Sequence, residues 1–288
     1  MDNLKAKKRH PEEIAVYSAI YVCAAFSVLL LLGIIVYVFA KGARRVNWAF
    51  LTGVTSILHG TVGIAGNILN TLIIILLTMI ITTPIGVGAA IYLNEYAKPG
   101  KLVTVIIFAT ETLAGIPSII FGLFGMLFFG QLCHMGYSLL TGSLTLTLMV
   151  LPLVTRNTQE ALKTVPDSFR TGAVGLGAGK WYTIRTILLP SAMPGIVTGV
   201  ILAIGRIIGE SAALLFTAGS AHLLPKTFDA FLEKIFHSGG TLTIQLYLSA
   251  SKGEFEVAFG IAVVLLVIVL LINFGTKRLA KKLSLIHI

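Results

Sequence analysis

Long apolar runs separated by shorter polar segments extend along nearly the whole chain. Six of them approach or exceed the roughly 17 residues that a helix needs to cross a hydrocarbon core of about 30 Å. Runs of this length are far too long for barrel strands, so they predict transmembrane helices. The six runs are Ile14–Ala40, Ile68–Leu93, Leu102–Gly130, Leu139–Thr155, Met193–Ala221 and Val257–Phe274.

The pattern therefore predicts an all-α fold, a polytopic membrane bundle of six transmembrane helices. The first run is too long for a cleaved signal peptide, and no small-residue cleavage site follows it. We therefore expect it to be a permanent transmembrane helix. The expected organisation is an N-terminal tail (1–13), a transmembrane domain (14–280) and a C-terminal tail (281–288). No internal repeat is visible, which gives no support to an inverted-repeat secondary transporter.

Composition and charge fit a membrane protein. Hydrophobic residues make up 56% of the 288 residues and charged residues only 12%, against roughly 25% charged in soluble domains. With the N-terminus placed in the cytoplasm, 15 of the 22 Lys and Arg residues fall in inside segments. This positive-inside bias predicts cytoplasmic termini in an inner (plasma) membrane, and it explains the +10 net charge without a nucleic-acid partner.

One cytoplasmic segment, 155–189, is neither a tight turn nor a separate domain, and it is predicted to form a helix, a turn and a second helix. A Pro-Asp-Ser sequence at 166–168 is typical of a helix start, with Asp167 or Ser168 as the expected cap. The glycine-rich stretch 175–179 then breaks the helix, and Pro190 is expected to end the second one. Such a loop can present a rigid projection to a soluble partner.

An outer loop near position 230 carries apolar residues at helical spacing. We expect a short amphipathic helix there, lying on the outer membrane surface or packed on the bundle. Its polar side would hold Asp229, Glu233 and Lys234. Its apolar residues are Phe228, Phe231, Leu232, Ile235 and Phe236.

Two charged residues, Arg206 and Glu210, fall near the middle of the fifth apolar run. Each costs roughly 2.5–3.5 kcal/mol at the centre of a membrane helix. Their i, i+4 spacing places them on one helical face, where they can pair. The pair either locks helices together or lines an anion pathway, because the forked donors of arginine suit a tetrahedral oxyanion.

Three further charged residues are candidates for the pathway. Glu111 lies in the third run, shortly before Gly115 and Pro117, which are expected to loosen that helix and free backbone groups. It is either a pathway acid or a satisfied structural acid. Arg156 and Glu160 form a second i, i+4 pair at the cytoplasmic boundary, either as a surface salt bridge or as part of an inner gate.

The sequence shows no catalytic or metal-binding constellation. The two cysteines and six histidines are scattered without ligand spacing, so no metal site is expected. Gly179-Lys180 resembles the end of a phosphate-binding loop, but Val174 and Trp181 break that pattern. We therefore expect a non-enzyme with no cofactor of its own.

The cytoplasmic segment resembles the signature of the permease subunits of bacterial ABC importers. That signature reads Glu-Ala-Ala, then Gly, then Ile-x-Leu-Pro, and it falls here on Thr171-Gly172-Ala173, Gly177 and Ile187-Leu188-Leu189-Pro190. The leading Glu and first Ala are replaced by Thr171 and Gly172. In the family this loop docks on an ATPase subunit, so the resemblance assigns these residues to ATPase coupling.

Other stretches are similar to the phosphate-specific (PstA-type) permeases within this family. They are Thr82-Thr83-Pro84-Ile85-Gly86, Ile91 to Tyr96, Glu111 to Ser118, Gly205 to Ala218 and Thr243 to Tyr247. The resemblance implies a type I ABC importer permease fold and phosphate as cargo. It also implies a sister permease, two ATPase subunits that bind ATP and Mg, and a periplasmic phosphate-binding protein.

These expectations define a hypothesis of alternating access. ATP binding would close the ATPases, which pull on 155–189, and phosphate would pass Arg206 inward. Three alternatives stay open: an ABC importer for another oxyanion (molybdate, sulfate or phosphonate), an ion-coupled transporter or channel, and a membrane enzyme.

Overall fold

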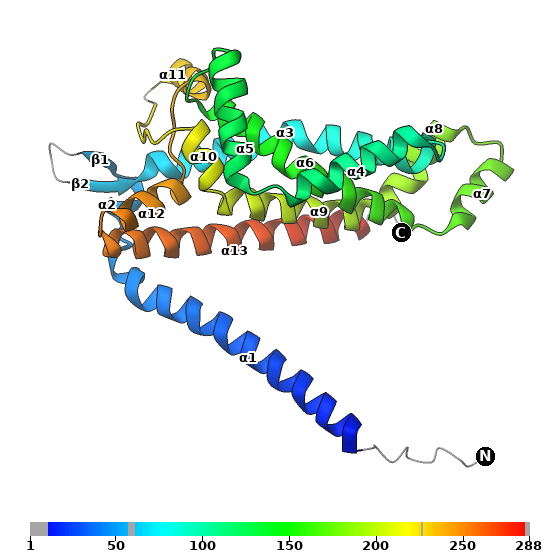
Figure 1. Ribbon diagram of the computed structural model, residues 1–288, viewed down its shortest axis with the longest axis horizontal. Helices are drawn as coiled ribbons and strands as arrows, with labels where there is room; N and C mark the ends of the chain where they lie inside the picture. Colours follow the sequence, from blue (N-terminus) through cyan, green and yellow to red (C-terminus); the bar gives the residue numbers. More distant parts are fainter. Residues whose placement is uncertain (1–10, 57–60, 226, 286–288) are drawn as a thin grey trace.

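Helices form nearly all of the structure, a computed structural model that describes residues 11–56, 61–225 and 227–285 (Figure 1). The helices are α1 (Pro11–Gly42), α2 (Trp48–Thr52), α3 (Ala65–Ile91), α4 (Lys101–Gly115), α5 (Ser118–Gly125), α6 (Leu139–Lys163), α7 (Asp167–Gly175), α8 (Lys180–Thr183), α9 (Leu189–Gly209), α10 (Ala212–Thr217), α11 (Phe228–Glu233), α12 (Leu242–Ser251) and α13 (Phe255–Leu285). The π-helical turns Tyr92–Tyr96, Met126–Leu132 and Ile184–Leu188 follow α3, α5 and α8, and 3-10 turns cover Ala43–Arg45 and Lys234–Phe236.

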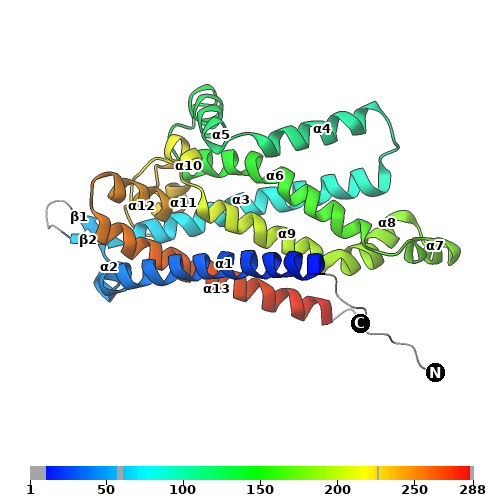
Figure 2. The same cartoon turned by 60° about the horizontal axis from the view of Figure 1, so that its bottom comes forward.

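The predicted all-α, six-span organisation is confirmed. Five helical segments of the described chain are long and apolar enough to cross a membrane, and the pair α4–α5 supplies a sixth span if counted as one. The five are Ala15–Arg45, Ala65–Tyr96, Leu139–Lys163, Lys180–Gly209 and Phe255–Arg278. The start of α1 and the end of α13 lie at the same end of the molecule as α7 and α8 (Figures 1 and 2).

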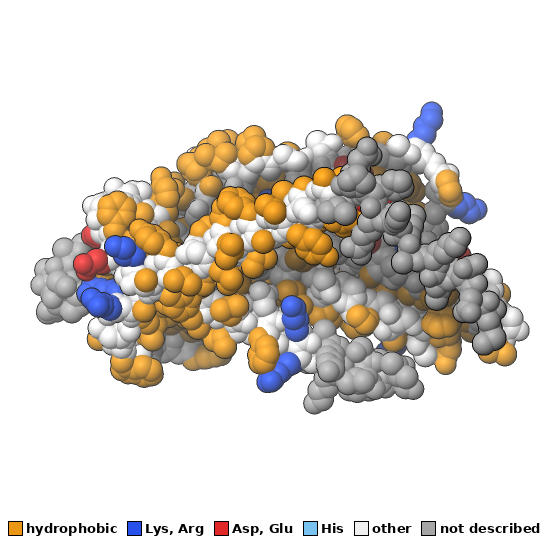
Figure 3. Space-filling model, turned by 90° about the horizontal axis from the view of Figure 1, so that it is seen from below, with side chains coloured by type: hydrophobic (Ala, Val, Ile, Leu, Met, Phe, Trp, Pro, Cys, Tyr) orange, Lys and Arg blue, Asp and Glu red, His pale blue; other side chains and the backbone are white. Residues whose placement is uncertain are grey.

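The centre of the bundle is α6, which packs between α3 and α9. Leu146 and Val150 are fully buried there. On the face that Figure 3 shows, apolar side chains cover much of the coloured surface, with few charged side chains among them. An apolar exterior around a packed interior is the arrangement that a hydrocarbon environment requires.

Helix α1 stands apart from the bundle along most of its length (Figures 1 and 2). Its apolar window is 0% buried, and it approaches α13 near its own C-terminal end. There Tyr37 packs edge-to-face on Phe259 with ring centroids 5.7 Å apart. Gly42 lies so close to α13 that a Cβ would stand 2.2 Å from the Phe259 carbonyl oxygen.

We expect Gly42→Ala to loosen the joint between α1 and α13. The new methyl group would meet backbone atoms, which cannot move aside as a side chain can, and overpacking of this kind costs about 1–3 kcal/mol. The thermal midpoint of the detergent-solubilised protein should fall. Gly33→Ala is the matched control, because nothing lies within 4 Å of that position. Equal midpoints for the two variants would contradict the tight joint.

The third span is broken, so its prediction as one helix is wrong. Helix α4 ends at Gly115, and α5 leaves at an angle of 103°. Ile116 between them is extended (φ −73°, ψ 133°), because a proline at 117 disfavours helical geometry in the residue before it. The predicted loosening effect of Gly115 and Pro117 takes the form of a sharp corner.

The fifth span also differs from its prediction at both ends. It begins earlier, because α8, the π-turn Ile184–Leu188 and α9 form one continuous segment, Lys180–Gly209. Pro190 therefore does not end a helix; it lies in the first turn of α9, a position where proline is tolerated. The segment ends earlier too, at Gly209, and α10 continues after a break at Glu210 and Ser211.

The end of the bundle opposite α7 contains a small hairpin and a polar anchor. Strands β1 (Val54–Ser56) and β2 (Thr61–Ile64) pair antiparallel, with Val54 opposite Ile64. The Nδ2 atoms of Asn67 and Asn70 on α3 both donate to the Gly240 carbonyl, at 2.9 and 3.0 Å. These bonds fasten the loop before α12 to the bundle.

The predicted amphipathic helix near position 230 is present as α11 and the 3-10 turn after it. Phe231 and Ile235 pack against the core, whereas Phe228 and Phe236 are exposed. The placement of Lys234 on an outward polar side is wrong. Lys234 is buried and donates to the Leu223 carbonyl, and burial lowers its pKa.

Candidate functional site

The predicted pairing of Arg206 with Glu210 is not present. The helix stops between them, since Glu210 is extended (φ −81°, ψ 123°) and stands outside α9. Its Oε1 accepts from the Ala213 amide at 3.0 Å, and its carbonyl accepts from Thr243 Oγ1 at 2.8 Å. Glu210 is 9% exposed and serves the first turn of α10, where a helix N-terminus favours negative charge.

Arg206 is left on an exposed stripe of α9. Leu202, Gly205 and Gly209 share this stripe, while Ala203 and Ile207 face the core. Within the described residues Arg206 has no ion pair. An unpaired guanidinium in a membrane span normally faces a water-filled cavity or another protein surface. Arg206 therefore adds a positive charge to this stripe, and no acidic side chain of the described residues pairs with it.

Glu111 is also exposed rather than buried, and it shares a cavity with the predicted gate residues. The cavity has a volume of about 180 Å³ and lies between α4 and the C-terminal part of α6. Arg156 Nε donates to Glu160 Oε1 at 3.2 Å. The lining residues are Leu93, Ile107, Thr110, Glu111, Arg156, Gln159, Glu160 and Lys163.

The cavity wall carries two basic and two acidic side chains, so its charges balance. Arg156, Lys163 and the Gln159 amide supply donors, while Glu111 and Glu160 compete for the same cations. Arg156 and Glu160 are both largely exposed, at 66% and 62% of their side chains, so their bond is a weak surface pair. The structure thus joins Glu111 to the gate candidates and separates it from Arg206 and Glu210, which do not line this cavity.

The segment 155–189 ends in a helical hairpin, which projects at one end of the bundle (Figure 1). The predicted start at 166–168 and the break at 175–179 are confirmed, since α7 covers Asp167–Gly175 and α8 begins at Lys180. Pro166, not an Asp or Ser side chain, occupies the cap position. Gly177 has φ +79°, a conformation that glycine adopts without strain, and it turns the chain back.

Large apolar side chains stand exposed on this projection. Leu176 at the turn is 91% exposed, an unusual state for a leucine on a polar projection. Together with four other exposed apolar side chains of the projection it forms a set that we call the apolar tip: Phe169, Val174, Leu176, Trp181 and Tyr182. No sequence pattern predicted that Phe169, Leu176 and Tyr182 would be exposed on this projection.

The residues assigned to coupling by resemblance divide into two groups. Thr171, Gly172 and Gly177 are exposed on α7 and the turn. Ala173 is buried beneath them, and Ile187, Leu189 and Pro190 are half-buried in the continuous segment that leads into α9. Ile187, Leu189 and Pro190 thus lie at the base of the projection, whereas Ala173 lies on the buried side of α7.

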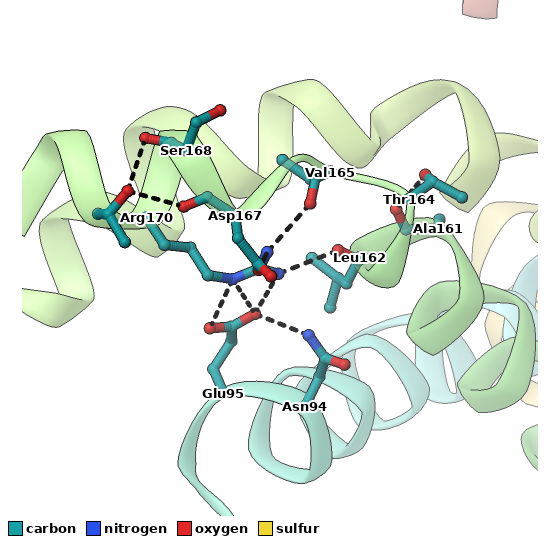
Figure 4. Close-up of polar contacts among 10 residues, drawn as sticks. Asn94, Glu95, Ala161, Leu162, Thr164, Val165, Asp167, Ser168 and Arg170 are labelled. Atoms are coloured by element: carbon teal, nitrogen blue, oxygen red, sulfur yellow. Dashed lines mark hydrogen bonds and ion pairs between the residues drawn. The ribbon is translucent and has the colours of Figure 1, made fainter.

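The projection is fastened to α3 by an ion pair that the sequence analysis did not find (Figure 4). Arg170 Nη2 lies 2.9 Å from Glu95 Oε1, and the Glu95 side chain is 8% exposed. Arg170 also donates to the Leu162 and Val165 carbonyls at 3.0 and 3.1 Å. The hydrogen bond to Glu95 raises the pKa of Arg170. The one sequence feature that pointed to such a contact is the high density of charged residues in the segment 155–189.

No group of three or more His, Cys, Asp or Glu side chains positioned to hold a metal ion occurs in the described ranges.

An apolar helical bundle with charged side chains in its spans and a helical projection at one end is the architecture of a membrane transport permease. The comparison with known families makes this specific. The chain belongs to the family of binding-protein-dependent transport system inner membrane components, whose sequence profile matches residues 82–285.

Several curated relatives align over most of their length. The "Probable ABC transporter permease protein YqgI" of Bacillus subtilis is 36% identical over 267 residues, covering 89% of this chain and 91% of that protein. The "Phosphate transport system permease protein PstA" of Xylella fastidiosa is 34% identical, covering 83% and 82%. "PstA 1" of Mycobacterium tuberculosis is 34% identical, covering 80% and 71%.

Solved structures share the fold at low sequence identity. A bacterial alginate ABC transporter in complex with its periplasmic protein matches with a TM-score of 0.70 at 14% identity, covering 95% of this chain and 96% of that one. The inward-facing MetNI methionine ABC transporter matches with a TM-score of 0.57 at 21% identity, covering 77% and 94%. The type I ABC importer permease fold is thereby confirmed.

Proposed function

We propose that this chain is the membrane-spanning translocation subunit of an ATP-driven importer whose cargo is inorganic phosphate. The single observation that supports phosphate as the cargo is the 34% identity, over 83% of the chain, to a permease named for phosphate transport. The permanently charged Arg206 within the membrane span and Arg156 near the end of another span support the choice, since arginine geometry matches tetrahedral oxyanions.

The route for phosphate is proposed to run along the exposed stripe of α9 and leave near the charged cavity. Arg206 attracts the anion within the span, and a sister permease is proposed to complete the other wall. Arg156 and Glu160, with Glu111 beside them, act at the inner mouth, where phosphate displaces the weak pair as it passes. Glu210 is proposed to stabilise the helix break after Gly209, which leaves Arg206 in the last turn of α9.

Coupling to ATP is proposed to occur at the projection. ATP and Mg would be bound by two partner ATPase subunits, and a periplasmic phosphate-binding protein would deliver the cargo at the opposite end. The apolar tip supports this assignment, because an exposed apolar surface on a polar projection is typical of a protein contact. In this orientation both termini and α7 face the cytoplasm, in agreement with the positive-inside bias.

The test is uptake of radiolabelled phosphate by proteoliposomes that hold the whole complex and its binding protein. We expect uptake only with internal ATP, at a rate that excess unlabelled phosphate suppresses and equal molybdate, sulfate or phosphonate does not. Stronger suppression by one of those anions would assign the importer to that anion. Phosphate uptake by this chain alone, without ATP, would favour an ion-coupled transporter or channel.

A further inference from the structure

We propose that Glu95 and Arg170 form a clamp that transmits movement of the cytoplasmic helix α7 to the membrane helix α3. This inference rests on the proposed function and assigns two positioning residues to it. The clamp comprises Glu95, Asn94, Arg170 and the carbonyl groups of Leu162 and Val165 (Figure 4).

Arg170 joins three parts of the chain at once. Its guanidinium bonds to Glu95 in the last turn of the α3 span, to the Leu162 carbonyl near the end of α6 and to the Val165 carbonyl in the link to α7. Nε adds contacts of 3.3 and 3.5 Å to the two Glu95 oxygens. Several bonds from one planar group fix its orientation as well as its position.

The carboxylate is held from its other side as well. Asn94 Nδ2 donates to Glu95 Oε1 at 2.7 Å. Glu95 and Asn94 belong to the π-turn Tyr92–Tyr96, which ends the α3 span. The same turn contacts the second helix of the projection, because Lys180 Nζ stands 4.7 Å from the centre of the Tyr96 ring. Both helices of the projection are thus attached to one turn of α3.

A displaced α7 therefore cannot move independently of α3 without breaking a largely buried ion pair. Loss of one partner from such a pair leaves an uncompensated charge, which is far more costly than loss of an exposed pair. Arg170 also bonds Asp167 at 3.0 Å, but Asp167 is 92% exposed and lies within α7 itself. That bond does not link α7 to the membrane helices.

Two measurements on the reconstituted importer test the clamp: amide hydrogen exchange across 167–175, and phosphate taken up per ATP hydrolysed. For Glu95→Gln and Arg170→Gln we expect exchange to accelerate by at least about tenfold, since the lost bonds are charge-assisted. Phosphate per ATP should fall by roughly fivefold or more, the lower range for coupling between sites. ATP hydrolysis should continue.

Matched variants separate a clamp from a general effect of substitution. Asp167→Asn removes the other carboxylate on Arg170 and should leave both measurements unchanged. Arg170→Lys keeps the charge but loses the fork, so it should give an intermediate ratio. Since the two residues act through each other, the double variant Glu95→Gln/Arg170→Gln should be no worse than the worse single variant.

Wild-type uptake is measured first, and its absence contradicts the proposed function itself. The clamp is contradicted by the variants instead. Unchanged exchange in Glu95→Gln would show that the pair does not hold α7. Faster exchange with an unchanged ratio of phosphate to ATP would show that the pair holds α7 without transmitting its movement.

Discussion

Replacing Leu176 by Asp is expected to prevent the ATPase subunits from assembling with this chain. Leu176 is 91% exposed at the turn of the projection, where a docked partner would cover it. Loss of the burial of a leucine side chain costs about 1.5–3 kcal/mol of binding free energy, which corresponds to a roughly ten- to hundredfold lower affinity. The desolvation of the introduced carboxylate adds to this loss. The measurement is co-purification of the ATPase with the tagged permease.

Leu223→Asp is the matched control for this experiment. Leu223 is 72% exposed and lies in the loop before α11, at the opposite end of the molecule from α7. The substitution introduces the same charge without touching the apolar tip, so the ATPase should co-purify as with wild type. Wild-type recovery of the ATPase with Leu176→Asp would exclude Leu176 from the docking surface.

The second large effect is expected for Arg206→Gln, which should lower phosphate uptake by roughly ten- to hundredfold. The estimate follows from the loss of a charge-assisted hydrogen bond, about 1.5–3 kcal/mol. Arg206 has no ion pair among the described residues, so its removal leaves no buried carboxylate behind. The fold and the assembly with ATPase should therefore persist, and initial uptake rates at matched complex levels provide the measurement.

Arg44→Gln removes the same charge outside the bundle and serves as control. Arg44 lies in the exposed 3-10 turn after α1, and its loss should leave the uptake rate near wild type. Arg206→Lys keeps a positive charge without the fork, so an intermediate rate is expected. Unchanged uptake in Arg206→Gln would remove Arg206 from the phosphate route and leave the stripe of α9 as an interface.

The length and polarity of segments were predictable because they depend on composition along the chain. A hydrocarbon core accepts only long apolar helices, so six apolar runs specify six spans whatever their packing. The turn of the projection was predictable for a similar reason, since glycines interrupt a helix and adopt the positive φ that Gly177 has in this turn. The corner at Pro117 also has a local cause, although only the structure gives its angle.

Side-chain partnerships were not predictable in this way. The expected pairing of Arg206 with Glu210 assumed an unbroken helix, but the Glu210 carbonyl is bound by Thr243 and its carboxylate by the Ala213 amide. Thr243 is 33 residues away along the chain. The helical spacing of Arg206 and Glu210 does not reveal that other groups form hydrogen bonds with Glu210 in place of Arg206. The same holds for Lys234, whose partner, the Leu223 carbonyl, lies in another loop.

By itself the sequence determined a membrane bundle with six spans, a helical projection between the fourth and fifth of them, and a resemblance to phosphate importer permeases. The tertiary structure alone decided which charges meet. Glu95 and Arg170 are 75 residues apart, and nothing local requires them to pair. Their contact exists because α3 and α6 end side by side, so the π-turn after α3 lies against the start of α7. Hydrophobic length is a local property, whereas an ion pair depends on where two separate elements come together.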